Sequence, residues 1–134
     1  MRRLRAVPLF MDCTDKQLEF IATRVEDLDL PAGKTLCEEG RSGGDFFIVL
    51  SGTAEVRKDG RVVGTMTEGD FFGEIALLDN GPRSATVVST TPMRCLVLGL
   101  GQFQDVLHQN AEIAVTLLRA VTHRLRASAS LKAD

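Results

Sequence analysis

Residues 54–66, Ala-Glu-Val-Arg-Lys-Asp-Gly-Arg-Val-Val-Gly-Thr-Met, contain the pattern that decides the fold. Asp59-Gly60 separates two short β-type runs. A two-residue type I′ turn needs positive φ angles at both central residues, and Asp followed by Gly suits that requirement. The pattern therefore predicts a tight hairpin between Ala54–Lys58 and Val62–Met66.

Further short β-type runs lie on both sides of this hairpin, separated by glycine-rich turns. They are Lys34–Glu38, Phe46–Ser51, Ser84–Ser89 and Met93–Leu98. Short strands broken by turn residues roughly every 8 to 12 positions are typical of an all-β sandwich or barrel.

Helical patterns flank the β region. Thr14-Asp15-Lys16-Gln17 is a capping-box pattern and predicts a helix over residues 14–25. A short helix is expected near Gly101–Leu107, with Asn110 as the N-cap of a final helix of roughly 20 residues. The apolar stripe of that helix is Ile113, Leu117, Val121 and Leu125. It belongs either to the core or to a face that packs against a partner or a neighbouring domain.

Composition limits the classes of function. The chain has 134 residues, of which 44% are hydrophobic and 25% charged, and this suits one globular domain. No apolar run approaches the roughly 20 residues of a membrane span, and no export signal is evident, so we expect a cytoplasmic location. A formal net charge of −2 argues against direct DNA binding by this chain.

The cysteines and histidines show no metal-binding or disulfide pattern. Cys13, Cys37 and Cys95 are widely spaced and odd in number, so we expect reduced thiols. His108 and His123 fall on predicted helices without neighbouring ligands at zinc spacing, so no metal site is expected.

The segment 71–89 interrupts the β pattern and carries the chemistry. Gly73 followed by Glu-Ile-Ala-Leu-Leu predicts a glycine turn into a short helix, whose free N–H groups and dipole suit an anion. Arg83 can offer a five-donor fork to a phosphate. Glu74, which can only accept, suits a sugar hydroxyl. Sugar and phosphate together indicate a nucleotide.

This segment resembles the phosphate-binding cassette of the cyclic-nucleotide-binding domain family. The matching residues are Phe72-Gly73-Glu74-Ile75-Ala76-Leu77 and, five residues later, Arg83-Ser84-Ala85-Thr86-Val87-Val88-Ser89. Residues 40–52 resemble the family's second marker, with one departure at Arg41, where the family more often has an acidic or amide residue.

The resemblance implies a fold and a domain division. The fold is mainly β with flanking helices: an eight-stranded jelly-roll-like β-barrel with a short N-terminal and a long C-terminal helix. We expect a single domain over 1–134, with an N-terminal helical segment at 9–26, the barrel at 27–100 with its cassette at 71–89, and C-terminal helices at 101–131.

The resemblance also implies site roles. Gly73 and Ala76 would offer backbone amides to the cyclic phosphate, Arg83 would neutralise it, and Ser84 would add a hydroxyl contact. Glu74 would accept a hydrogen bond from the ribose 2′-hydroxyl. Ser128 falls where one branch of the family has an adenine-contacting hydroxyl, although a solvated serine is an equal alternative. The full expected ligand-binding set is Phe72, Gly73, Glu74, Ile75, Ala76, Arg83, Ser84, Ala85 and Ser128.

The implied function is a regulatory module rather than an enzyme. The expected ligand is cyclic AMP, with cyclic GMP as the other candidate, and no further cofactor is expected. Binding would be signalled through the C-terminal helix to a homodimer partner or a tethered effector domain. The competing interpretation is a ligand-free interaction scaffold of the same fold. An enzyme acting on nucleotides would need a positioned base, nucleophile or metal, and none is evident.

Overall fold

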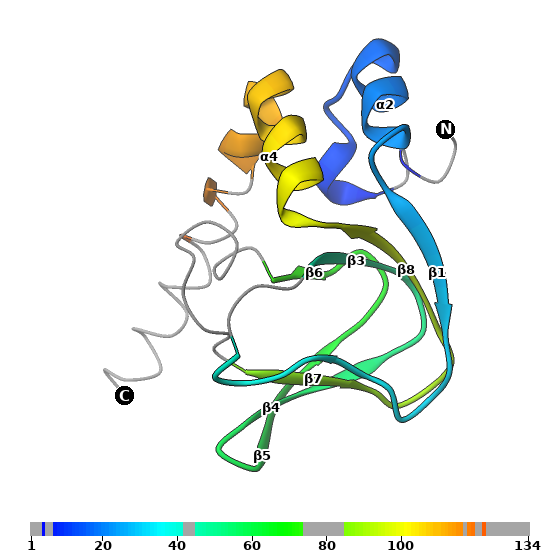
Figure 1. Cartoon of the computed structure of the whole chain (residues 1–134), viewed down its shortest axis with the longest axis vertical. Coiled ribbons are helices and arrows are strands. Elements are labelled where there is room, and N and C mark those ends of the chain that lie inside the picture. Colours follow the sequence, from blue (N-terminus) through cyan, green and yellow to red (C-terminus); the bar gives the residue numbers. More distant parts are fainter. Residues whose placement is uncertain are drawn as a thin grey trace.

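The computed structural model describes residue 4 and residues 7–41, 45–73, 85–116, 118, 119 and 122. Within this part of the chain, eight strands form two antiparallel four-stranded sheets, with helices packed against one of them (Figure 1). The strands are β1 (Glu26–Leu30), β2 (Thr35–Cys37), β3 (Phe46–Ser51), β4 (Ala54–Lys58), β5 (Arg61–Met66), β6 (Phe71–Phe72), β7 (Thr86–Ser89) and β8 (Met93–Leu98).

The strand order is that of a jelly roll. One sheet has the order β1-β8-β3-β6 and the other β2-β7-β4-β5, so strands that follow one another in sequence often lie in different sheets. Such a double sheet is how jelly rolls bury a common interior. The predicted fold class is therefore confirmed. In the described chain no strand ladder joins the two sheets into a continuous barrel.

The hairpin forms as the sequence predicts. Asp59 has φ 53° and Gly60 has φ 78°, and Lys58 pairs with Arg61 across the turn. Strand β5 begins at Arg61, one residue before the predicted start. Two strands, β1 and β6, lie outside the predicted runs.

The N-terminal helical region consists of a 3-10 turn, η1 (Pro8–Phe10), and α2 (Asp15–Ala22). The capping box is present: Thr14 Oγ1 accepts from the Gln17 backbone N–H at 3.2 Å, and the Gln17 side chain accepts from the Thr14 N–H at 2.8 Å. The helix ends at Ala22, before the predicted end at residue 25, because the chain must turn into β1.

The first C-terminal helix is α4 (Leu100–Gln109), and residues 111–116, 118, 119 and 122 are also helical. Ile113 of the predicted stripe is buried, whereas Leu117, Val121 and Leu125 lie outside the described residues. No helix of the described chain has the length and apolar character needed to cross a bilayer.

Asn110 occupies the N-cap position that the sequence predicts. It precedes the next helix, and its backbone oxygen accepts from the N–H of Ile113 at 3.1 Å. Its side chain, however, is 1% exposed and turns back toward α4, where Nδ2 donates to the Val106 oxygen at 3.4 Å. Oδ1, the atom that would cap the helix, has no hydrogen-bond partner in the described structure.

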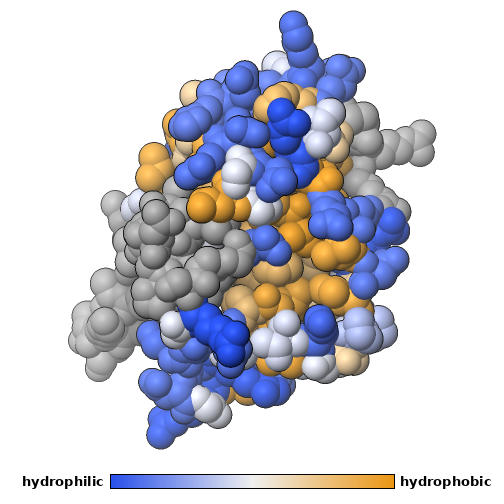
Figure 2. Space-filling view, viewed as in Figure 1, coloured by the Kyte–Doolittle hydropathy of each residue, from blue (hydrophilic) through white to orange (hydrophobic). Residues whose placement is uncertain are grey.

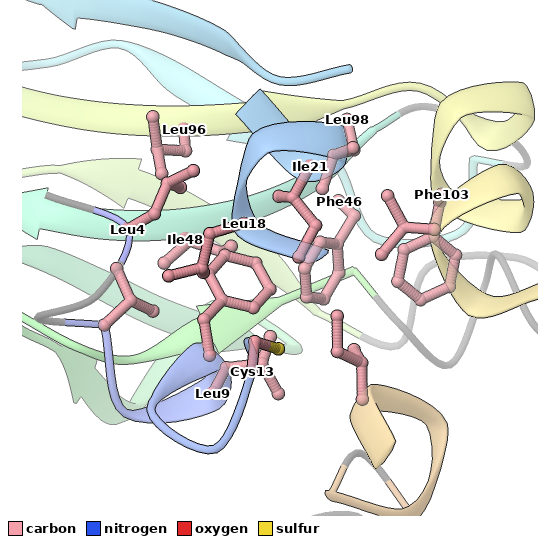
Figure 3. Close-up of a cluster of buried hydrophobic side chains, with 14 residues drawn as sticks. Leu4, Leu9, Cys13, Leu18, Ile21, Phe46, Ile48, Leu96, Leu98 and Phe103 are labelled. Atoms are coloured by element: carbon pink, nitrogen blue, oxygen red, sulfur yellow. The ribbon is translucent and has the colours of Figure 1, made fainter. Parts of the chain in front are cut away.

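Strands β3 and β8 are buried on both faces and divide the core into two layers. Phe46 and Ile48 point toward the helices, whereas Phe47 and Val49 point between the sheets, as a period of two requires. Figure 3 shows the helix-side cluster, in which Leu18 and Ile21 of α2 meet Phe46 and Phe103. This layer fixes the helices on the sheet that contains β6.

We predict that Gly52→Ala destabilises the protein more than Gly60→Ala does. Both glycines have positive φ angles, 89° and 78°, so each alanine incurs a left-handed backbone cost of about 1–2 kcal/mol. A Cβ at Gly52 would also lie 2.9 Å from the Met93 Cα and would clash with the Pro92 backbone, whereas a Cβ at Gly60 meets nothing within 4 Å. Urea denaturation of both variants tests this, and equal losses of stability would contradict it.

Candidate functional site

The predicted cassette connects the two sheets. Residue 73 follows β6, which belongs to one sheet, and residue 85 precedes β7, which belongs to the other. Phe72, Gly73 and Ala85 are described and lie at the two ends of the connection. The other predicted site residues lie outside the described residues: Glu74, Ile75, Ala76, Arg83, Ser84 and Ser128.

The first end is anchored by aromatic packing. Phe72 is 4% exposed, pairs in register with Phe47 of β3, and stacks on its ring with centroids 4.9 Å apart. The neighbouring Phe71 lies on the opposite face of the strand, 5.8 Å from the ring of Phe46. Strand β6 contains only two residues, and its ladder with β3 is correspondingly short. The packing of the two rings therefore helps to hold the chain where the cassette begins.

Gly73 has the backbone conformation that the sequence suggested. Its φ is 99°, in the region where a side chain would be strained. The short helix predicted after Gly73 lies outside the described residues.

The second end is anchored by hydrogen bonds to the segment around β2. The Cys37 thiol donates to the Ala85 oxygen at 3.6 Å. The Glu39 backbone N–H donates to Thr86 Oγ1 at 2.9 Å. Strand β7 also pairs with β4, where Thr86 lies opposite Arg57. The residues at the start of β7 are therefore held from two sides.

Glu39 extends this anchoring to the hairpin turn. Its Oε1 accepts a hydrogen bond from the Asp59 backbone N–H at 3.1 Å. One residue thus connects the tip of the β4–β5 hairpin with the first residue of β7. Sequence reasoning gave no role to Cys37, Glu39 or Thr86, and only Thr86 lies within the segment that carried the resemblance.

The interior between the sheets is apolar. Its buried members are Phe47, Val49, Ala54, Phe72, Val87, Met93, Cys95 and Val97. Figure 2 shows apolar surface across the middle of this face, between the helical end and the end formed by β4 and β5.

Burial controls the titration of two thiols. It raises the pKa of Cys95, between the sheets, to about 11. It also raises the pKa of Cys13, with smaller contributions from Glu112 and Asp12. All three cysteines are free, as expected, and Cys37 is the partly exposed one. At neutral pH the Cys95 side chain is an uncharged thiol that behaves as part of the apolar interior.

Several arginines of the described chain already have carboxylate partners. Arg41, the departure from the family pattern, is exposed and pairs with Glu38 at 3.1 Å. Arg57 pairs with Glu55 at 2.7 Å. Arg94 pairs with Asp27 at 2.9 Å, and this hydrogen bond raises the pKa of Arg94 above its usual value. These three guanidinium groups are therefore already paired with carboxylates within the protein.

The histidines give no sign of a metal site in the described part of the chain. His108 is exposed on α4, and His123 lies outside the described residues. Among the residues that the structure describes, no group of three or more His, Cys, Asp or Glu side chains could hold a metal ion.

Comparison with known proteins identifies the same region. The family model described as the cyclic nucleotide-binding domain matches residues 28–110. The chain is 38% identical over 106 residues to the cAMP-dependent protein kinase regulatory subunit of Yarrowia lipolytica. The match covers 78% of this chain and 28% of that protein, so the chain spans little more than a quarter of its relative.

Two solved structures share the fold. One is the cAMP-bound PfPKA-R, with a TM-score of 0.85 and 30% identity, covering 98% of this chain and 45% of that one. The other is the catabolite activator protein of Thermus thermophilus, with a TM-score of 0.84 and 27% identity, covering 95% of this chain and 62% of that one.

We predict that Cys95 reacts with iodoacetamide about 100-fold more slowly in the folded protein than in the denatured chain at pH 8. A rise in the pKa from 9.0 to about 11 reduces the thiolate fraction by about that factor, and burial slows the reaction further. Quench-and-digest mass spectrometry measures each cysteine separately, and Cys37 should react before Cys95. Equal rates at Cys95 in the folded and denatured chains would contradict the burial described here.

Proposed function

We propose that this chain, which belongs to the cyclic nucleotide-binding domain family, is a regulatory module. It binds cyclic AMP between β6 and β7. The observation that carries the proposal is the cassette sequence, which lies where the chain passes from one sheet to the other. The similar proteins support the choice of ligand, since a cAMP-dependent kinase subunit and a cAMP-bound structure are among them.

The proposed contacts follow the chemistry of the ligand. The backbone amides of Gly73 and Ala76 and the guanidinium of Arg83 bind the cyclic phosphate, because a fork of donors matches its two free oxygens. Glu74 accepts from the ribose 2′-hydroxyl. Ser84 adds a hydroxyl contact to the phosphate.

The remaining proposed residues frame the ligand. Phe72, Ile75 and Ala85 line the cassette, and Ser128 approaches the adenine. The anchored positions of Phe72 and Ala85 support this arrangement, because a site whose ends are fixed beforehand loses less entropy on binding. Family members that prefer cyclic GMP often have Thr directly after the arginine, and Ser84, which is less diagnostic, leaves cyclic AMP as the proposed ligand.

The proposed output runs through the C-terminal helices. The ring of Phe46 lies 5.8 Å from Phe71 in β6 and 4.6 Å from Phe103 in α4. A displacement of β6 on ligand binding would therefore reach α4 through one buried ring. Val115 is 44% exposed and Leu118 63% exposed on the next helix. Such apolar side chains suit contact with a second copy or with a tethered effector domain.

We propose no catalytic activity for this chain, because the curated relatives to which it is similar are regulatory subunits. Ligand binding would shift the population between alternative positions of the C-terminal helices. The size of that shift is limited by the difference in the ligand's affinity for those positions. The cytoplasmic location stays a prediction from the sequence.

Isothermal titration calorimetry tests the proposal. The wild-type chain should bind cyclic AMP with micromolar or tighter affinity and cyclic GMP more weakly. A flat titration at millimolar cyclic AMP would contradict the proposal and favour the ligand-free scaffold. Linear 5′-AMP is the control for the cyclic phosphate.

Arg83→Ala should weaken cyclic AMP binding by about 3–5 kcal/mol, the cost of removing one partner from a buried charge pair. The matched control is Arg61→Ala, which removes an exposed arginine from β5 of the same sheet as β7 and should leave the Kd unchanged. If Arg83→Ala binds like the wild type, the phosphate is held elsewhere.

A further inference from the structure

The start of β7 is held by a set of contacts that no ligand role explains. Thr86 is half-buried and is the first residue of β7. Its Oγ1 accepts a hydrogen bond from the Glu39 backbone N–H, 47 residues away, at 2.9 Å. Thr86 is β-branched, so its side chain has few rotamers and can hold this geometry well.

Glu39 is itself held in place. Its carboxylate accepts from the Asp59 backbone N–H at 3.1 Å, at the hairpin turn. Asp59 and Gly60 occupy the left-handed region, so the amide direction at this turn is set by the hairpin. The path Asp59, Glu39, Thr86 therefore connects a rigid turn to the first residue of β7.

The contacts of Thr86 also bear on Arg83, because only a short stretch of chain separates the two residues. Arg83 precedes Thr86 by three residues, so the two backbones are at most about 11 Å apart even when fully extended. A guanidinium fork depends on orientation much more than an ammonium does, because its donors lie in one plane. A small rotation of the chain at Thr86 would therefore misalign Arg83 with the phosphate.

We propose that Thr86 and Glu39 form a brace that positions Arg83, and that this brace sets the affinity for the cyclic phosphate without touching the ligand. The inference rests on the proposed function, since it concerns the same site. Thr86 and Glu39 are positioning residues. Thr86 acts through its hydroxyl, and Glu39 through its backbone N–H and its carboxylate.

The test compares Thr86→Val with Thr86→Ser in the full chain, with cyclic AMP as the probe in calorimetry. Valine keeps the branched shape and removes the acceptor, so cyclic AMP affinity should fall about tenfold, the size expected for one lost hydrogen bond. Serine keeps the acceptor and should restore affinity to within about twofold of the wild type. Thr65→Val, at an exposed position in β5, is the matched control and should bind like the wild type.

A second measurement separates positioning from a general structural effect. Thr86→Val is combined with Arg83→Lys, which keeps the charge but loses the planar fork. If the brace acts through the guanidinium, Thr86→Val should cost clearly less affinity in the lysine background than in the wild type. Equal losses in both backgrounds would overturn the proposal, because the effects of independent sites add.

Glu39 provides an independent variant should Thr86→Val fold poorly. Glu39→Gln keeps a side-chain oxygen acceptor for the Asp59 amide and should bind cyclic AMP like the wild type, whereas Glu39→Ala should weaken binding. If the wild type binds cyclic AMP and the Thr86 and Glu39 variants all match it, the brace alone is refuted. If the wild type does not bind, the proposed function fails and the brace fails with it.

Discussion

The connection from Gly73 to Ala85 must leave one sheet and enter the other. The proposed binding site depends on how the two ends of this connection are held. On the β6 side, Phe72 is buried and stacked on Phe47. On the β7 side, Thr86 is bonded to the backbone of Glu39. Both attachments are made by protein groups, so each end of the connection is held against a neighbouring segment of the chain.

The sheet that contains β6 also packs against the helices. The start of the cassette and the helices proposed to carry the signal therefore share one sheet. Strand β3 has one face in each core layer: Phe47 packs between the sheets, and Phe46 packs under α4. Packed interiors transmit strain because they contain few voids. A change at the cassette therefore has a direct route through adjacent residues of one strand to the helix side.

The sequence predicted those features that depend on local chemistry. The Asp59-Gly60 hairpin and the capping box at Thr14 involve residues a few positions apart, and both are present. Strand β1 does have a local signal, because Asp27-Leu28-Asp29-Leu30 alternates polar and apolar residues. Strand β6 has only two residues and gives no periodic signal, so its pairing with β3 emerges from tertiary structure.

Contacts outside the local sequence patterns account for what the sequence did not predict. Asn110 occupies the predicted cap position, but its side chain turns back to the Val106 oxygen of α4 and away from the next helix. The hydrogen bond between Glu39 and Thr86 joins residues 47 positions apart, and no pattern in the sequence relates one of them to the other. The cassette motif indicated the chemistry of the site, whereas the way its ends are anchored is visible only in three dimensions.

A crystal structure of the chain with cyclic AMP tests the central claim most directly. The account predicts that the cyclic phosphate lies between β6 and β7, contacted by main-chain amides following Phe72 and by the Arg83 guanidinium, while Phe72 and Thr86 keep the contacts described here. A nucleotide bound elsewhere, or a phosphate facing solvent with Arg83 turned away from it, would contradict the account.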